Sequence, residues 1–258
     1  MIFGVVIFVL GINIGSFLNV LIDRLPHGET LWGRSHCDHC KKKIVWYDNI
    51  PLLSFFILGR KCRHCHKKIS WQYPIIELLT GVIFVFTYST MVRTMVLPIF
   101  WWLLLVNLII MSGLIVIFFA DLKYRIIPDE ILLILGTAAL VNIILINIRD
   151  LPGHLISGIV LFLIFLALFL ITRGKGMGMG DVKYAFVMGL LLGYPSSIIG
   201  FYTAFLTGAF VSVILILGGK KKFGQTIAFG PFLVAATYIA YIWGEPLWKM
   251  FLRVTGYA

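Results

Sequence analysis

Apolar residues run along this chain in long stretches, and not in the alternating or 3.6-residue patterns of soluble domains. A helix needs roughly 20 mostly apolar residues to cross a bilayer core about 30 Å thick. We therefore expect an all-α polytopic membrane protein with about eight transmembrane helices. The expected spans are 2–22, 74–90, 96–119, 130–148, 154–172, 182–194, 197–217 and 227–243. Gly193-Tyr194-Pro195 separates the sixth span from the seventh.

The largest polar segment, 23–73, suggests the domain organisation. We expect a first transmembrane helix at 1–22, a small cytosolic domain at 23–73 and a transmembrane bundle at 74–258. The other loops are short, as expected for antiparallel neighbouring helices. We recognise no sequence repeat.

Composition and charge narrow the class. The 258 residues are 60% hydrophobic and only 13% charged, which argues against an ordinary soluble domain. The net charge is +11, and most Lys and Arg fall in loops on one side of the predicted spans. Because Lys and Arg collect on the cytoplasmic side, the asymmetry places 23–73 in the cytosol. The basic loops are then explained by topology and attraction to lipid headgroups, and we expect no nucleic-acid partner.

Two cysteine pairs lie in the cytosolic segment: Cys37 with Cys40, and Cys62 with Cys65. Two CxxC turns supply four thiolates, which is the ligand set of a closed structural zinc site. A polar segment of this size also needs such a staple to fold. The alternatives are redox-active pairs or simple reduced thiols. The histidines beside the cysteines are read as solvated surface residues.

Two aspartates stand at the edges of predicted spans on the cytosolic side. Asp121 follows the third span, and Asp181 opens the sixth after Gly178-Met179-Gly180. Two carboxyl groups at one membrane depth suit an aspartyl protease, in which they share one proton. The alternative is that they cap helices or pair with nearby Lys and Arg. Residue types alone do not decide between these readings.

Several motifs resemble bacterial prepilin peptidases, the prepilin leader peptidase/N-methyltransferase family of GxGD membrane aspartyl proteases. Gly178-Met179-Gly180-Asp181 resembles the GxGD motif, and Asp121 with Ile127-Pro128-Asp129 resembles the partner aspartate loop. The two CxxC pairs match as well. Further matches, in order along the chain, are Gly15-Ser16-Phe17-Leu18-Asn19-Val20, 48–54, 73–81 and Phe229-Gly230-Pro231-Phe232.

The resemblance implies an inner-membrane enzyme of a type IV pilus, type II secretion or competence system, with its active site facing the cytosol. It would cleave the leader of prepilins or pseudopilins after a glycine. Asp121 and Asp181 would be the catalytic pair, with Asp129, Gly178 and Gly180 supporting them. The family also N-methylates the new amino terminus with S-adenosylmethionine. Gly59-Arg60-Lys61-Cys62 departs slightly from the family pattern, which weakens that second assignment.

Glu77, near the start of the second span, has two readings. It pairs with a cytosolic cation, or it holds the pilin amino terminus or the methyl donor. Two rival functions also remain open: a polytopic transporter with a zinc module, and a non-catalytic assembly scaffold. A transporter would place acids near the membrane midplane and show two matching halves. A scaffold would tolerate loss of both aspartates.

Overall fold

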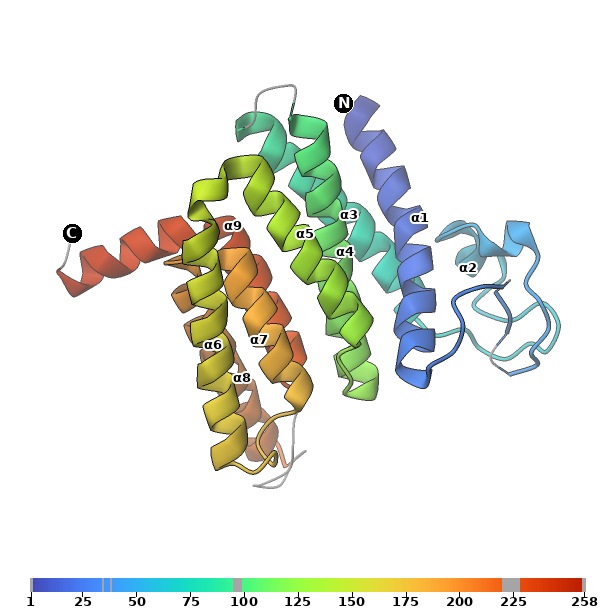
Figure 1. Ribbon diagram of the computed structural model, residues 1–258. Helices are drawn as coiled ribbons and strands as arrows, with labels where there is room; N and C mark the ends of the chain where they lie inside the picture. Colours follow the sequence, from blue (N-terminus) through green and yellow to red (C-terminus); the bar gives the residue numbers. More distant parts are fainter. Residues whose placement is uncertain (1, 34, 38, 95–98, 220–227, 257–258) are drawn as a thin grey trace. The chain divides into compact units, whose positions relative to one another are not determined.

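The computed structural model describes residues 2–33, 35–37, 39–94, 99–219 and 228–256. These residues form helices and loops with two isolated β-bridges and no β-strand (Figure 1). The prediction of an all-α protein is confirmed. The chain divides into two compact units, Met1–Val116 and Ile117–Ala258.

The longer helices follow the predicted spans closely. They are α1 (Ile2–Arg24), α3 (Gln72–Thr94), α4 (Phe100–Tyr124), α5 (Asp129–Asn147), α6 (Leu151–Ile171), α7 (Met179–Leu192), α8 (Ser196–Leu217) and α9 (Gly230–Thr255). A short α2 (Leu53–Ile57) lies in the polar segment, with 3₁₀ turns at Leu25–His27, Trp46–Asn49 and Ile148–Asp150. The break predicted at Gly193-Tyr194-Pro195 is confirmed.

Within the described residues, five stretches are long and apolar enough to cross a membrane, by length and composition. They are Ile2–His27, Gln72–Val92, Phe100–Tyr124, Asp129–Ile171 and Ser196–Leu217. Asp129–Ile171 joins α5 and α6, because its 43 residues are continuously helical. A polytopic protein is therefore confirmed, while the count of about eight spans stays a prediction.

The predicted spans 182–194 and 227–243 have no counterpart among these five stretches. With 14 residues, α7 is about 21 Å long, which is shorter than a bilayer core. α9 runs beyond the predicted end, to Thr255, and is more polar in its second half. The first residues predicted for two spans, 96–98 and 227, lie outside the described residues, as does the basic loop 220–222.

In the first unit, α1 packs along α3 through small residues. A Cβ atom added at Gly11 would lie 2.7 Å from the Gly81 Cα, and one added at Gly15 would lie 2.7 Å from the Glu77 Cα. Only glycine allows the two backbones to approach this closely. One turn further, Asn19 donates from its side-chain amide to the Tyr73 carbonyl at 3.2 Å. These contacts hold α1 close against α3.

In the second unit, α7 is the central helix and packs against α5, α6, α8 and α9. Ten of its residues are buried, including Asp181. Its contact with α6 also depends on glycine, because a Cβ at Gly189 would lie 2.5 Å from the Ser157 carbonyl oxygen. A cluster of phenylalanines, formed by Phe165, Phe201, Phe205 and Phe229, fixes the start of α9 between α6 and α8.

Candidate functional site

Asp121 lies in the last turn of α4, which ends at Tyr124. The span predicted at 96–119 ends too early, because no glycine or proline stands between residue 119 and Arg125. The positive φ of 57° at Arg125 follows the helix end. The Asp121 side chain is buried, with 6% exposure. Its Oδ2 accepts a hydrogen bond from the backbone N–H of Gly230, at the start of α9, at 2.9 Å. A helix from the far end of the chain therefore contacts this carboxyl group.

Asp181 lies in the first turn of α7 and is 7% exposed. Its Oδ2 accepts the backbone N–H of Gly178 at 2.9 Å, which satisfies one of the free donors at the helix start. Gly180 faces the loop after α4, because a Cβ added there would lie 3.1 Å from the Ile127 Cβ. The second glycine of the motif thus lets α7 begin against that loop.

The structure brings these two aspartates into one site within the second unit. The charge of Asp121 acts on the Asp181 carboxyl group, so the two lie within electrostatic range of each other. Each accepts one backbone N–H, and both are buried. Two buried carboxyl groups that interact in this way do not both ionise at low cost, and they titrate as a pair.

Asp129 opens α5 and is separate from this contact. Both of its carboxylate oxygens accept hydrogen bonds from the Lys183 ammonium, at 2.7 and 2.8 Å. Both side chains are largely exposed, so the ion pair contributes little to stability. It does join the loop after α4 to the first turns of α7. From the sequence, Lys183 was one of the cations that could pair with Asp121 or Asp181. In the structure it pairs with Asp129.

The four cysteines form a candidate metal centre in the first unit. The Sγ atoms of Cys37, Cys40, Cys62 and Cys65 all lie within 4.8 Å of one another. The Sγ atoms of Cys37 and Cys65 are 3.8 Å apart. Four sulfurs in a tetrahedron with Zn–S bonds of about 2.3 Å are separated by about 3.8 Å. The cluster therefore fits a zinc ion, and it could hold one.

The two cysteine turns repeat one structure, which the sequence analysis missed. Residues 37–44 read CDHCKKKI and residues 62–69 read CRHCHKKI. An isolated bridge flanks each turn, His36 to Lys43 and Lys61 to Lys68. The same backbone hydrogen bonds close both: Cys37 N–H to Lys42 O at 3.0 Å, and Cys62 N–H to Lys67 O at 2.9 Å. The statement that no repeat is present was wrong, because the repeat is too short to stand out among polar loop residues.

The backbone of the second turn prepares its first cysteine as a ligand. The N–H groups of Cys65 and His64 point at the Cys62 sulfur and lower the pKa of its thiol to about 7. A thiolate is the form that binds a metal. The pKa of Cys65 in the same turn moves the other way, to about 11, because burial and the neighbouring cysteine sulfurs oppose its ionisation. The backbone of the turn therefore prepares one of its two thiols as a thiolate.

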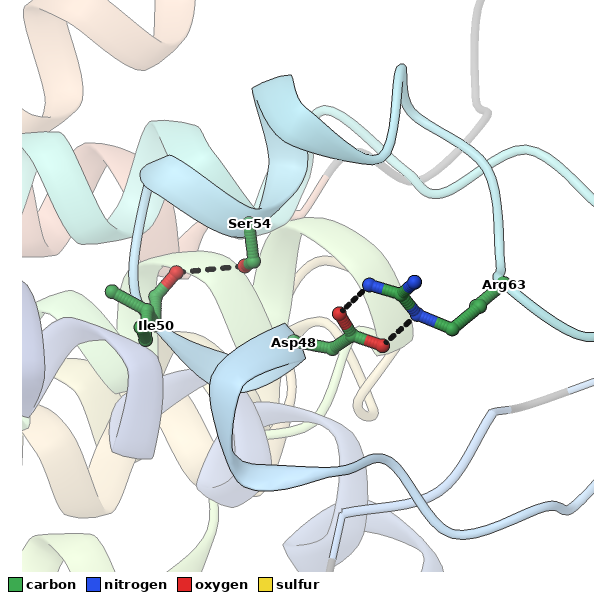
Figure 2. Close-up of polar contacts among 4 residues, drawn as sticks. All are labelled: Asp48, Ile50, Ser54 and Arg63. Carbon is green, nitrogen blue, oxygen red and sulfur yellow. Dashed lines mark hydrogen bonds and ion pairs between the residues drawn. The ribbon is translucent and has the colours of Figure 1, made fainter.

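An ion pair braces this metal module, which we define as residues 35–70. Figure 2 shows the Arg63 guanidinium aligned with the Asp48 carboxylate through two hydrogen bonds of 2.7 and 2.6 Å. The same view shows the Ser54 hydroxyl donating to the Ile50 carbonyl at 2.7 Å. The bond from Arg63 holds the pKa of Asp48 below its usual value. Arg63 belongs to the second CxxC turn, so the pair ties that turn to the linker between the two turns.

Glu77 connects α3 to the metal module. Its Oε2 accepts the backbone N–H of Leu52 at 2.7 Å, and the Ser16 side chain is a second hydrogen-bond partner. Leu52 has a positive φ of 61°, a strained conformation for a branched residue. The Glu77 carboxylate thus stabilises this strained turn at the start of α2. Among the described residues, its contacts are with a backbone amide and a hydroxyl, and not with the cytosolic cation that one interpretation expected.

Comparison with known proteins gives the family. The model described as Bacterial Peptidase A24 N-terminal domain matches residues 9–91, and the Type IV leader peptidase family matches residues 108–213. The prepilin leader peptidase/N-methyltransferase of Aeromonas hydrophila is 32% identical over 95% of this chain and 92% of its own length. The chain belongs to the type IV leader peptidase family. The proteins of the same description from Pseudomonas aeruginosa and Myxococcus xanthus are 28% and 31% identical.

Membership of the type IV leader peptidase family confirms the predicted class, a membrane aspartic peptidase. The shares covered are 96% of this chain with 93% of the Pseudomonas protein, and 98% with 76% of the Myxococcus protein. The match therefore includes the metal module as well as the aspartate-bearing helices. No solved structure gives a match.

Two contacts around the aspartates were not predicted from the sequence. Gly230 stood in a recognised motif, yet nothing in the sequence shows that its N–H meets Asp121, 109 residues away. Lys183 was considered only as a possible partner of Asp121 or Asp181, and not of Asp129. Both contacts depend on how α7 and α9 pack, and a single sequence carries no signal for that.

Proposed function

We propose that this chain cleaves the leader peptide of type IV prepilins or pseudopilins, using Asp121 and Asp181 as its catalytic pair. The relatives that it resembles are named prepilin leader peptidase/N-methyltransferase, and they match over nearly its whole length. The observation that carries the proposal is the buried, interacting pair of carboxyl groups, each held by a backbone N–H. A pair of structural helix caps would not need to be buried together.

The pair supports a two-aspartate mechanism. One carboxylate is ionised and takes a proton from a water molecule, whose oxygen attacks the carbonyl carbon of the scissile bond. The protonated partner donates its proton to the carbonyl oxygen, which gives a neutral diol. When the diol collapses, one of its hydroxyl groups gives its proton to the aspartate that is now ionised. The C–N bond breaks, and the nitrogen takes the proton that the other aspartate received from the water. One product is the leader with a free carboxyl group, and the other is the pilin with a new amino terminus.

Three further residues support the pair in this proposal. Gly178 supplies the N–H that holds the Asp181 carboxylate. Gly180 leaves room for Ile127, and Asp129 binds Lys183, so two contacts join the loop after Asp121 to the helix of Asp181. These contacts fix the segments that carry the two acids. Such positioning matters, because a displacement of about 1 Å costs an enzyme about 100-fold in rate.

The proposed location in the cell rests on the distribution of Lys and Arg among the loops. We propose that the metal module, the end of α4 and the start of α7 lie on the cytosolic side of a bacterial inner membrane, and the one-sided distribution of Lys and Arg supports this orientation. A prepilin inserted with its leader in the cytosol would then present its scissile bond at the depth of Asp121 and Asp181. We propose that this bond follows a glycine, as the family resemblance implies.

We further propose that residues 23–73 form a zinc-stapled domain between the first helix and a bundle at 74–258. The four thiolates close the coordination sphere of the ion and leave no position for water, so zinc stabilises the fold there and takes no part in hydrolysis. The chelating turns, and not an apolar core, would then supply most of the folding free energy of this domain.

N-methylation of the new amino terminus is proposed on the names of the relatives alone. S-adenosylmethionine needs partners for its carboxylate, ammonium and adenine groups. The groove in the first unit is lined by apolar side chains and Ser89, and it does not fit that molecule. Glu77, the residue suggested for this role, already accepts a hydrogen bond from Leu52. No residue is therefore assigned to the methyl donor.

Cleavage of a prepilin by purified protein in detergent or lipid tests the proposal. The wild type should cut after a glycine, and Asp121→Asn and Asp181→Asn should each lose more than about 1,000-fold in rate while staying folded. The mass of the pilin product shows the cut, and an added methyl group shows the second activity. Variants that cut like wild type would make the aspartates structural. A wild type that cuts no precursor would favour a scaffold.

A further inference from the structure

We propose that Gly230 is a positioning residue for the aspartate pair: its N–H, presented by the first turn of α9, holds the Asp121 carboxylate in its working orientation. This inference rests on the proposed function for its kinetic part only. The contact itself is a structural statement and can be tested without any substrate. No part of the proposed cleavage mechanism requires a residue at this position.

The first argument is the geometry at residue 230. The Gly230 N–H and the Asp121 Oδ2 are 2.9 Å apart, and both residues are buried. A Cβ atom added at Gly230 would lie 2.6 Å from that Oδ2, 2.8 Å from the Asp121 Cγ and 3.0 Å from its Cβ. Real Cβ atoms do not approach other atoms this closely, so any side chain at 230 would displace the carboxylate. The hydrogen bond to Asp121 therefore requires that residue 230 is a glycine.

The second argument is that the start of α9 cannot easily move aside. The neighbouring Phe229 ring packs against Phe205 at 5.2 Å and against Phe165 at 6.3 Å, between α6 and α8. Phe165 is fully buried. A side chain at residue 230 would therefore push on Asp121 more readily than on α9, because the interior of the bundle is close-packed.

The third argument is that α9 also contacts the helix of the second aspartate. Two turns after Gly230, the Thr237 hydroxyl accepts a hydrogen bond from the Tyr184 hydroxyl at 2.9 Å, and neither side chain is exposed. Tyr184 follows Asp181 by nearly one turn of α7. One face of α9 thus touches the carboxylate of Asp121 and the helix that carries Asp181. It sets the position of one acid relative to the other.

The hydrogen bond also has an electrostatic effect. An N–H group at a helix start donates to the ionised form of a carboxyl group and favours it. Because the two carboxyl groups titrate together, losing this donor makes ionisation of the pair harder. The acid limb of the rate–pH profile should then move to higher pH. A side chain that merely supports the fold would not move that limb.

A double-mutant cycle on thermal unfolding tests the contact in the full-length protein in detergent. Gly230→Ala should lower the unfolding midpoint in the wild type, and it should lower it by less than half as much in Asp121→Ala, which lacks Oδ2 and Cγ. Gly189→Ala is the matched control, because its Cβ would meet the Ser157 carbonyl at 2.5 Å. It should cost the same in both backgrounds. Equal costs for Gly230→Ala in both backgrounds would overturn the contact.

Kinetics on a prepilin test the positioning role. Gly230→Ala should lose about 100-fold in kcat with KM changed by less than about 3-fold, and its acid limb should rise by about one pH unit. Gly189→Ala should keep the wild-type kcat per folded molecule and the wild-type acid limb. A folded Gly230→Ala with kcat and acid limb like wild type would refute the role. An Asp121→Asn variant that cleaves normally would refute the proposed function instead, whatever the unfolding cycle shows.

If the steric clash prevents Gly230→Ala from folding, the double variant still tests the contact. Recovery of a folded protein in the Gly230→Ala, Asp121→Ala double variant would support the contact, since the second change removes the obstructed atoms. Failure of the double variant, with Asp121→Ala folded, would count against it. The clash would then lie with other neighbours of Gly230.

Discussion

The metal module and the aspartate site bring side chains together in different ways. In the metal module, each pair of ligands comes from one short turn, and backbone bonds between near neighbours, such as Cys37 to Lys42, shape that turn. At the aspartate site, each acid comes from a different helix, and Asp121 is held by a residue 109 positions away. Local chain geometry specifies the first site, whereas helix packing specifies the second. The two should therefore fail under different perturbations.

Removing the metal should give the largest effect and should affect one region only. Structural zinc sites contribute apparent binding free energies of about 10–16 kcal/mol, so chelation should unfold residues 35–70. Limited proteolysis should then cut within 35–70 and spare α5–α9. Adding zinc back should restore protection. Unchanged protection after metal removal, or loss of the bundle together with the module, would contradict the comparison.

Disturbing helix packing should destabilise the bundle and leave the metal module intact. Gly189→Ala places a Cβ 2.5 Å from the Ser157 carbonyl, and overpacking of this kind costs up to about 3 kcal/mol. The unfolding midpoint of the bundle should fall while the metal content stays at the wild-type level. Gly136→Ala, whose Cβ would meet no atom within 4 Å, is the matched control and should change the midpoint little. Because helix propensity alone favours alanine over glycine, equal destabilisation by both variants would mean that the contact with Ser157 is not the cause.

Glu77→Gln should weaken the connection between α3 and the metal module. The Leu52 N–H would donate to a neutral oxygen in place of a carboxylate, and hydrogen bonds to charged groups are worth about 1.5–3 kcal/mol. We expect a loss of about 1–2 kcal/mol for the module, measured by hydrogen exchange in α2. Ser54→Ala, which removes only a bond to Ile50, serves as a milder control. Unchanged exchange in Glu77→Gln would show that the strained turn is held by other contacts.

The Asp48–Arg63 pair should give the smallest effect. Arg63 is half exposed, so Arg63→Ala should lower the stability of the module less at neutral pH than metal removal or Glu77→Gln. Because folding lowers the pKa of Asp48, the pair stabilises the module above the unfolded-state pKa of about 3.9. That stabilisation is lost as the pH falls through the lower, folded-state value. Unfolding of wild type and Arg63→Ala should therefore converge once the pH is below the lowered pKa of Asp48, and a difference that persists there would exclude the charge as its cause.

The same contrast explains what the sequence could and could not predict. Apolar runs gave most helices, because crossing a bilayer requires a length of chain that can be counted. The CxxC spacing gave the metal ligands, because two residues between cysteines already fix the turn. The cysteine repeat could have been read by aligning residues 37–44 with 62–69.

The contacts of the acids could not be read in this way. The Asp121 bond to Gly230, the Lys183 bond to Asp129 and the Leu52 bond to Glu77 all join residues that are distant in sequence. Packing alone decides which donor meets which carboxylate. The resemblance to a family pointed to these residues, but it did not say which atoms touch.

The duplicated cysteine turn has a consequence for metal affinity. One turn supplies two thiolates, which is half of a closed shell, so a lone turn would need a second molecule to complete it. Here the residues between Cys40 and Cys62 tether the second turn to the first. Completing the ligand set therefore requires only that this loop closes, and not that two molecules meet. The effective concentration of one half-site around the other is then set by tether length, at about millimolar or above for short linkers. Lengthening the tether would dilute one half-site relative to the other without altering any ligand.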